Sequence, residues 1–134
     1  MNTFIQAHAG DANWQIALGA CWAQLRHQLQ DGLKPNLGWC YITDHYTQAA
    51  GNIMDALRER MPGVHWVGTV GVGVAAEAVE YVDEPGMVLM LADLAAGAFK
   101  LFSSPSPLEP GADGFEAFTA LVHADGGAAD LPAQ

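Results

Sequence analysis

Basic residues are scarce in this chain. Five lysines and arginines stand against fifteen aspartates and glutamates among 134 residues, which gives a formal net charge of −10. No lysine or arginine follows Lys100. A surface of this charge has little with which to neutralise a row of phosphates or an anionic membrane surface. We therefore expect no nucleic acid among the partners.

Long hydrophobic runs are missing as well. The longest apolar stretch without a charge, Val64–Ala76, falls short of the roughly 20 residues that span a bilayer. The N-terminus has neither the basic region nor the continuous apolar region of a signal peptide. These absences predict a soluble cytoplasmic protein with no membrane insertion.

Residues for nucleophilic or metal chemistry are few and scattered. The three serines all fall within Ser103–Ser106, and the five histidines show neither HxxxH nor HExxH spacing. Cys21 and Cys40 have no CxxC spacing and lie among apolar neighbours, as small buried hydrophobic residues do. We therefore expect a protein that is not an enzyme and that has no cofactor and no metal site.

The apolar fraction, by contrast, is high: 51% of residues are apolar and 15% are charged, so the chain should fold around one core. Apolar residues recur at helical spacing over Asp11–Leu29 and Thr47–Met61, which predicts two amphipathic helices. Asp11 or Asn13 can cap the first helix. Leu37–Thr43 is apolar on both faces and too short for a helix, which indicates an interior strand.

Further strands are expected after the second helix. Val64–Val70, Glu80–Val82 and Met87–Leu91 have strand composition, and Ala98–Phe102 is a fifth candidate. Residues Asp83–Gly86 have turn chemistry at every position. Because no long helix separates the later strands, they should pair antiparallel.

The predicted fold class is therefore α/β, with a mixed, partly antiparallel sheet of five or six strands and two principal helices. Leu37–Thr43 should run parallel to Val64–Val70, and the second helix should join them with a right-handed connection.

Three regions are predicted along the chain. Residues 1–102 should form the α/β core, and the Pro/Ser/Gly-rich residues 103–114 a linker. Residues 115–134 should hold a strand at Phe118–Val122 and the start of a truncated unit. An uncovered apolar strand there predicts either a homodimer through sheet edges or helix-free faces, or a disordered tail after about Gly111.

Three segments of the chain resemble a known family. Trp39–His45, Trp66–Val74 and Val79–Pro85 look like the N-terminal half of the FIST sensory domain, and the resemblance covers nearly the whole chain. It implies a ligand-sensing module of bacterial signal transduction inside the cell, with small molecules such as amino acids as ligands. It also implies association with a C-terminal half that this chain lacks.

The candidate ligand-binding residues follow predicted strands. The run Gly68–Gly73 can either bend the strand or bring backbone N–H groups to a ligand. Residues 43–45 lie at the carboxyl end of an interior strand, where open α/β sheets bind ligands. The expected contacts are Thr43, Asp44, His45, Thr69, Gly71 and Glu77.

Each of these residues has an alternative interpretation. Asp44 can cap the second helix and His45 can be a solvated turn residue, while Glu77 and Glu80 can be simply hydrated. An acid–base pair, either Asp44 with His45 or His123 with Asp125, is the remaining catalytic alternative.

Two further function classes follow from the resemblance and from the charge. The resemblance implies small-molecule sensing. Where relatives have polar residues after the strand, only Thr69 keeps a hydroxyl here, and together with the acidity this favours a small cationic or zwitterionic ligand, or none. The alternative is a structural or assembly module without a small ligand.

Overall fold

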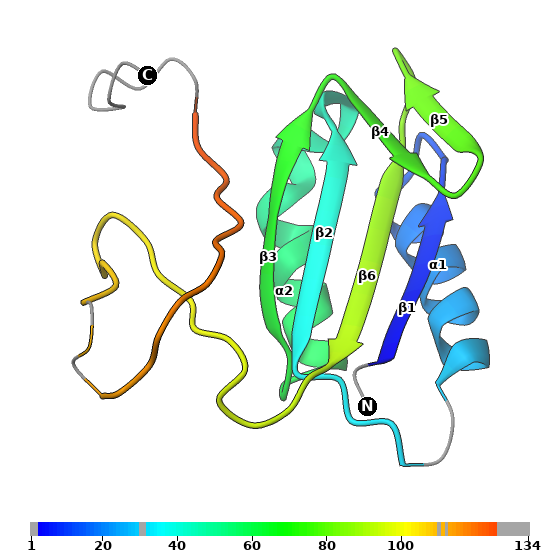
Figure 1. Ribbon diagram of the computed structural model, residues 1–134. Helices are drawn as coiled ribbons and strands as arrows, with labels where there is room; N and C mark the ends of the chain where they lie inside the picture. Colours follow the sequence, from blue (N-terminus) through cyan, green and yellow to red (C-terminus); the bar gives the residue numbers. More distant parts are fainter. Residues whose placement is uncertain (1–2, 30–31, 110, 112, 126–134) are drawn as a thin grey trace. The chain divides into compact units, whose positions relative to one another are not determined.

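The computed structural model describes residues 3–29, 32–109, 111 and 113–125, in two units, residues 1–96 and 97–134. The first unit is a mixed α/β domain with two α-helices, a four-stranded sheet and a two-stranded sheet (Figure 1). The predicted fold class is therefore confirmed. In chain order, the elements are β1 (Thr3–Ala9), α1 (Trp14–Gln28), β2 (Leu37–Thr43), the 3₁₀-helix η1 (Asp44–Ala49), α2 (Ala50–Arg60), β3 (His65–Gly71), β4 (Gly73–Ala76), β5 (Val79–Val82) and β6 (Met87–Asp93).

The larger sheet has the strand order β1-β6-β2-β3. Strands β2 and β3 pair in parallel over seven residues, as the sequence predicts, whereas β6 is antiparallel to both β1 and β2. The connection from β2 through α2 to β3 is right-handed in Figure 1, because α2 lies behind the sheet and β3 to the left of β2. Strand β5 pairs antiparallel with β4 in the smaller sheet and not with β6.

Both α-helices pack on one face of the four-stranded sheet (Figure 1). Side chains that alternate along the strands meet the apolar face of each helix, since successive residues of a strand point to opposite faces. The core residues with almost no exposed surface include Leu18, Cys21, Leu25, Ile53, Met87, Leu89 and Leu91.

The helix boundaries follow local capping. The Asn13 side chain accepts a hydrogen bond from the Gln15 N–H at 2.8 Å, so Asn13 is the N-cap of α1. The second helix begins later than predicted, because residues 44–49 form η1 and regular α-helix starts at Ala50. The Thr47 hydroxyl donates to the Asp44 carbonyl at 2.7 Å within this tighter turn.

Two predicted strands are wrong, and two observed strands were not predicted. Ala98–Phe102 and Phe118–Val122 have no strand structure, and Phe118 is 95% exposed. Apolar composition alone does not make a strand where no neighbouring strand supplies backbone hydrogen bonds. The strands that the sequence pattern missed are β1 and β4. The division at residues 102 and 114 stays a prediction.

The outer edge of β1 is hydrogen-bonded at Gln6 and His8 by side chains from α1. Gln28 accepts from the Gln6 N–H at 3.3 Å and donates to the Gln6 carbonyl at 2.6 Å. Gln24 makes the same pair of hydrogen bonds with His8, at 3.1 and 2.8 Å. Each side-chain amide therefore takes the place that the peptide group of a neighbouring strand would take.

The parallel pairing of β2 and β3 requires a glycine at position 68. In the register, Gly68 lies beside Cys40, and a Cβ placed on Gly68 would overlap the Cys40 backbone carbonyl. The clash is with main-chain atoms, which cannot rotate away as a flexible side chain does. Within the glycine-rich run, Gly68 is therefore needed because β2 and β3 approach each other closely at this position.

We predict that Gly68→Ala destabilises the domain by about 2 kcal/mol or more, because β2 and β3 must separate to admit the methyl group. The free energy of unfolding from urea titration measures this loss. Gly51→Ala in α2 is the matched control, since a Cβ there meets nothing within 4 Å. Alanine is the better helix former, so the control should gain about 0.5–1 kcal/mol. Equal effects of the two substitutions would contradict this account of the sheet.

Candidate functional site

The predicted site residues start from the carboxyl ends of two neighbouring parallel strands. Thr43 ends β2 and lies beside Gly71, which ends β3, and Thr69 lies beside Tyr41. The parallel register therefore brings the two predicted segments to the same end of the sheet. Asp44 and His45 follow immediately in η1.

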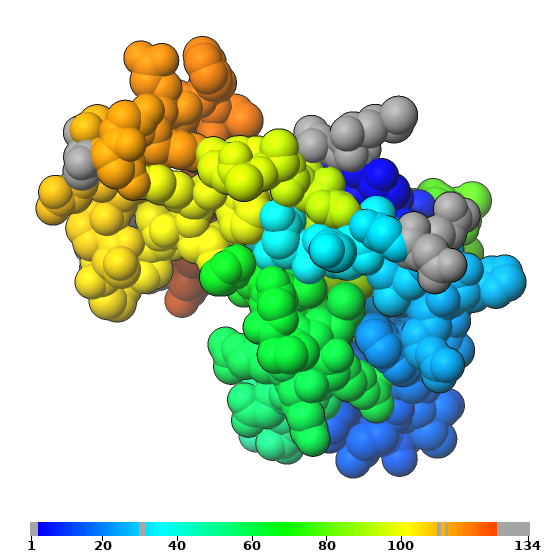
Figure 2. Space-filling view, turned by 90° about the horizontal axis from the view of Figure 1, so that it is seen from below, coloured from blue at the N-terminus to red at the C-terminus, as the bar shows by residue number. Residues whose placement is uncertain are grey.

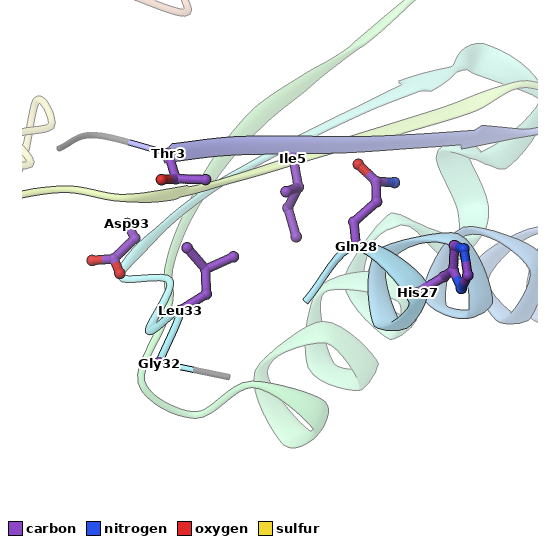
Figure 3. Close-up of a pocket in the computed structure, with 7 residues that line it drawn as sticks. All are labelled: Thr3, Ile5, His27, Gln28, Gly32, Leu33 and Asp93. Atoms are coloured by element: carbon purple, nitrogen blue, oxygen red, sulfur yellow. The ribbon is translucent and has the colours of Figure 1, made fainter. Parts of the chain in front are cut away.

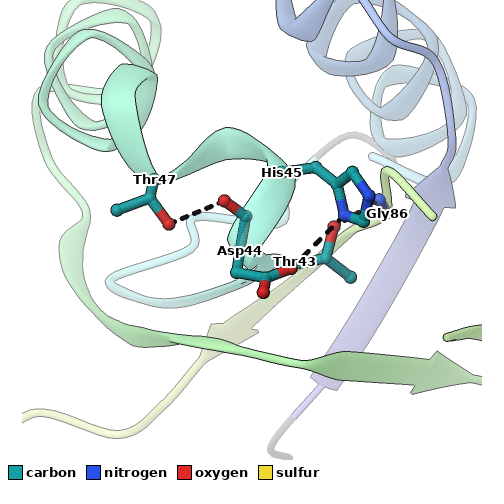
Figure 4. A network of polar contacts seen from close by, with 5 residues as sticks. All are labelled: Thr43, Asp44, His45, Thr47 and Gly86. Carbon is teal, nitrogen blue, oxygen red and sulfur yellow. Dashed lines mark hydrogen bonds and ion pairs between the residues drawn. The ribbon is translucent and has the colours of Figure 1, made fainter. Parts of the chain in front are cut away.

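Thr43 is completely buried, and its polar groups are bonded to Gly86 (Figure 4). The Thr43 hydroxyl oxygen accepts from the Gly86 N–H at 2.9 Å, and the Thr43 N–H donates to the Gly86 carbonyl at 2.9 Å. This pair of bonds ties the end of β2 to the residue before β6. Thr43 thus positions the turn that leads into β6.

Asp44 and His45 are exposed and in contact with each other. His45 Nδ1 lies 3.3 Å from a carboxylate oxygen of Asp44. Figure 4 shows both side chains beside Thr43, on the turn that connects β2 to α2. Together with Asp83 they line an open hollow of about 400 Å³.

Asp83 was missed as a site residue by the sequence reasoning. It follows β5 and has a φ of 55°, a left-handed conformation that aspartate tolerates better than most residues. The turn chemistry of residues 83–86 was recognised, but its proximity to Asp44 arises only from the fold. The bonds between Thr43 and Gly86 hold this turn near η1.

The other predicted residues do not line this hollow. Thr69 is exposed, and its hydroxyl donates to the Val70 carbonyl at 3.4 Å. Glu77 has a φ of 55° in the tight turn between β4 and β5. Its carboxylate accepts from Gln6 Nε2 at 3.3 Å, which links this turn to β1. The six residues therefore do not form one cluster.

The β4–β5 hairpin is held against β1 by Tyr81. The Tyr81 hydroxyl and His8 Nδ1 are 2.8 Å apart, and the two rings lie 5.8 Å from centroid to centroid. Atoms of Tyr81 lie where side chains at Gly10 and Gly86 would begin. Because neither position has a Cβ, the tyrosine can pack there. This packing holds the β4–β5 hairpin in place, and Asp83 is the residue after the hairpin.

The two cysteines are buried, and burial raises the pKa of the Cys21 thiol and of the Cys40 thiol to about 12. Both are therefore protonated at neutral pH and poorly nucleophilic. Among the described residues, no three or more His, Cys, Asp or Glu side chains are grouped as metal ligands would be. In the same part of the chain, no helix is both long enough and apolar enough to cross a membrane.

Comparison with protein families finds one match, the FIST N domain, over residues 36–131, which is well over half of the chain. The matched range contains the Asp44, His45 and Asp83 hollow together with β2, β3 and β6. No curated protein and no solved structure matches this chain.

We predict that Thr43→Val lowers the free energy of unfolding by about 1–3 kcal/mol, because it leaves the buried Gly86 N–H without an acceptor. Valine has nearly the same shape, so the loss reports on the hydrogen bond rather than on packing. Thr69→Val, at an exposed position, should change stability by less than about 0.5 kcal/mol. Urea unfolding of both variants tests this difference, and an unchanged Thr43→Val would show that the bond to Gly86 contributes little.

Proposed function

Because this chain belongs to the FIST N domain family, a sensory family of signal transduction, we propose that it binds a small ligand in the cytoplasm and transmits this binding event as a signal. The observation that carries the proposal is the hollow at the carboxyl end of β2, lined by Asp44, His45 and Asp83. Its position agrees with the general rule that open α/β sheets bind ligands beyond the carboxyl ends of their strands.

The charge of the hollow favours a ligand with an amino group. Two of its three lining side chains are carboxylates, and the chain carries a net charge of −10. An ammonium group would form charge-assisted hydrogen bonds with Asp44 and Asp83. We therefore propose a cationic or zwitterionic ligand, such as an amino acid or a polyamine.

The remaining predicted residues have supporting roles in this proposal. Thr69 and Gly71, at the end of the neighbouring strand, would contact the more distant part of a longer ligand. Thr43 acts through Gly86 and Glu77 through Gln6, so both would position the site. Nothing in this arrangement calls for a reacting group, and we propose binding without catalysis.

The two carboxylates come from separate segments, which suggests how binding is transmitted. Asp44 belongs to η1, whereas Asp83 follows the β4–β5 hairpin. A ligand that contacts both would hold the hairpin and η1 together, and Tyr81 connects the hairpin to His8 on β1. Binding would then stiffen a segment that depends on a few polar contacts.

We predict that lysine, arginine or putrescine raises the melting temperature. A ligand at about ten times its Kd stabilises the fold by about 1.4 kcal/mol, or roughly 4 °C or more for a domain of this size. Asp44→Asn and Asp83→Asn should each remove most of the shift, because the amide keeps the shape and loses the charge. Asp55→Asn on α2, an exposed residue paired with Arg58, is the control and should keep it. The sensing proposal fails if none of these ligands produces a shift that depends on Asp44.

A second candidate function, assembly without a small ligand, is favoured by the difference between the two sheet edges. The β1 edge is hydrogen-bonded at His8 and Gln6 by Gln24 and Gln28, as described above. Strand β3 pairs only with β2 among the described strands, and its seven residues include no lysine and no proline. Edge strands of natural proteins usually carry such protection against pairing with another chain.

Self-pairing of β3 would produce a homodimer with a continuous sheet. In an antiparallel pair centred on Gly68, Val67 would lie opposite Thr69 of the second copy, and Trp66 opposite Val70. No like charges would face each other in this register. Repulsion between two chains of charge −10 would oppose the dimer, so added salt should strengthen it.

For this candidate we predict a dimer by light scattering, strengthened between low and moderate salt. Thr69→Lys adds a charge to the β3 edge and should restore the monomer. Gln48→Lys adds the same charge at an exposed position in η1 and should have no effect. Removing both Gln24 and Gln28 side chains by substitution with alanine should expose the β1 edge and give larger assemblies. A wild-type monomer at all salt concentrations would contradict the assembly role.

A further inference from the structure

A larger cavity lies at the other end of the sheet from the Asp44 hollow. It has a volume of about 580 Å³, within the range of small-molecule sites. Figure 3 shows Ile5 and Leu33 pointing toward one another across it, with Asp93 at one side and the end of α1 at the other. Its lining residues are Thr3, Ile5, His27, Gln28, Gly32, Leu33 and Asp93.

This cavity is separate from the proposed sensing site. Asp93 ends β6 and Asp44 follows β2, and these two strands are antiparallel, so the two aspartates lie at opposite ends of the sheet. Of the lining residues, only Asp93 falls within the range that matches the FIST N domain. The cavity is therefore built almost entirely from the part of this chain that precedes the matched range.

Within the described ranges, the Asp93 carboxylate is held in place by a hydrogen bond that uses one of its two oxygens. Its Oδ2 accepts from the Lys34 N–H at 3.0 Å. Asn36 fixes the next residue by two bonds, donating from Nδ2 to the Leu94 carbonyl at 2.9 Å and accepting from the Leu94 N–H at 3.1 Å. Figure 2 shows the segment before β2 lying against the segment after β6. A carboxylate accepts about four hydrogen bonds, so Asp93 can bind a further donor.

The rest of the lining sets the chemistry of that donor. The carboxyl end of α1, which carries partial negative charge, borders the cavity at Gln28. The Gln28 amide is already bonded to Gln6, and Arg26 lines a different hollow. No lysine or arginine is among the lining residues that the structure describes. Ile5 and Leu33 supply an apolar surface between the polar ends.

We propose that this cavity binds a small primary aliphatic amine. Its ammonium group donates to the Asp93 carboxylate and is favoured by the carboxyl end of α1. Its alkyl chain lies against Ile5 and Leu33. A carboxylate on the ligand is disfavoured, because the described lining residues offer Asp93 and a helix carboxyl end but no lysine or arginine to receive it.

Calorimetric and NMR titration with n-pentylamine, n-pentanol and n-pentanoate, three probes of equal chain length, tests the proposal. Pentylamine should bind at least roughly tenfold more tightly than pentanol, the difference that one charge-assisted hydrogen bond supplies, and pentanoate should not bind. The amide resonances of Ile5 and Leu33 should shift during the titration. Equal affinity for amine and alcohol would overturn the proposal.

Two variants and one control variant complete the experiment. Asp93→Asn can still accept from the Lys34 N–H but has no charge, so pentylamine affinity should fall at least roughly tenfold. Leu33→Trp fills the cavity and should abolish binding. Asp55→Asn, at an exposed position of α2 outside both sites, should leave pentylamine binding at Ile5 and Leu33 unchanged. Pentylamine shifts of the Ile5 and Leu33 resonances that keep the same affinity in Asp93→Asn would overturn the proposal.

Discussion

Two hydrogen bonds between Thr43 and Gly86 join the end of β2 to the start of β6, and both the sheet and the candidate site depend on them. They close the central pair of strands at the end where η1 begins. They also fix the turn that carries Asp83, so that a carboxylate from the hairpin lies near Asp44 and His45. A residue with no exposed surface thus determines the geometry of a site that it does not line.

The site combines a rigid side with a less restrained one. Asp44 and His45 follow β2, which is hydrogen-bonded on both edges and buried in the core. Asp83 follows a two-stranded hairpin with two exposed valines, Val79 and Val82, and the Tyr81–His8 contact attaches this hairpin to β1. Small two-stranded sheets have little stability of their own. Such a division suits a binding domain, because ligand contacts can order the weaker side without disturbing the core.

Sequence patterns located the elements that the core defines and missed those that depend on distant partners. The bounds predicted for β2 are the observed ones, because an apolar run buried on both faces is visible residue by residue. Strand β1 was not predicted because its inward residues include the small Ala7 among polar neighbours. Its pairing partner β6 also lies about 80 residues later in the chain. Asp83 was identified only as a turn residue, since its place near Asp44 comes from the bonds of Gly86. The wrong strand at Phe118–Val122 had suitable composition but no neighbouring strand.

Gln24 and Gln28 are four residues apart on a helix, and the residues that they contact, His8 and Gln6, are two residues apart on a strand. Four residues of α-helix rise about 6.0 Å, and two residues of strand rise about 6.6 Å. Each glutamine amide therefore lies almost directly opposite the peptide group that it contacts, at Gln6 or His8. The small difference between these two rises adds up with each further pair of contacts. The side-chain amide of a third glutamine would therefore be displaced from the peptide group of the strand. Four hydrogen bonds nevertheless fix the rotation and the sliding of α1 relative to β1. Any mechanical displacement of the helix must therefore carry the first strand with it, and through that strand the Tyr81 contact at its far end.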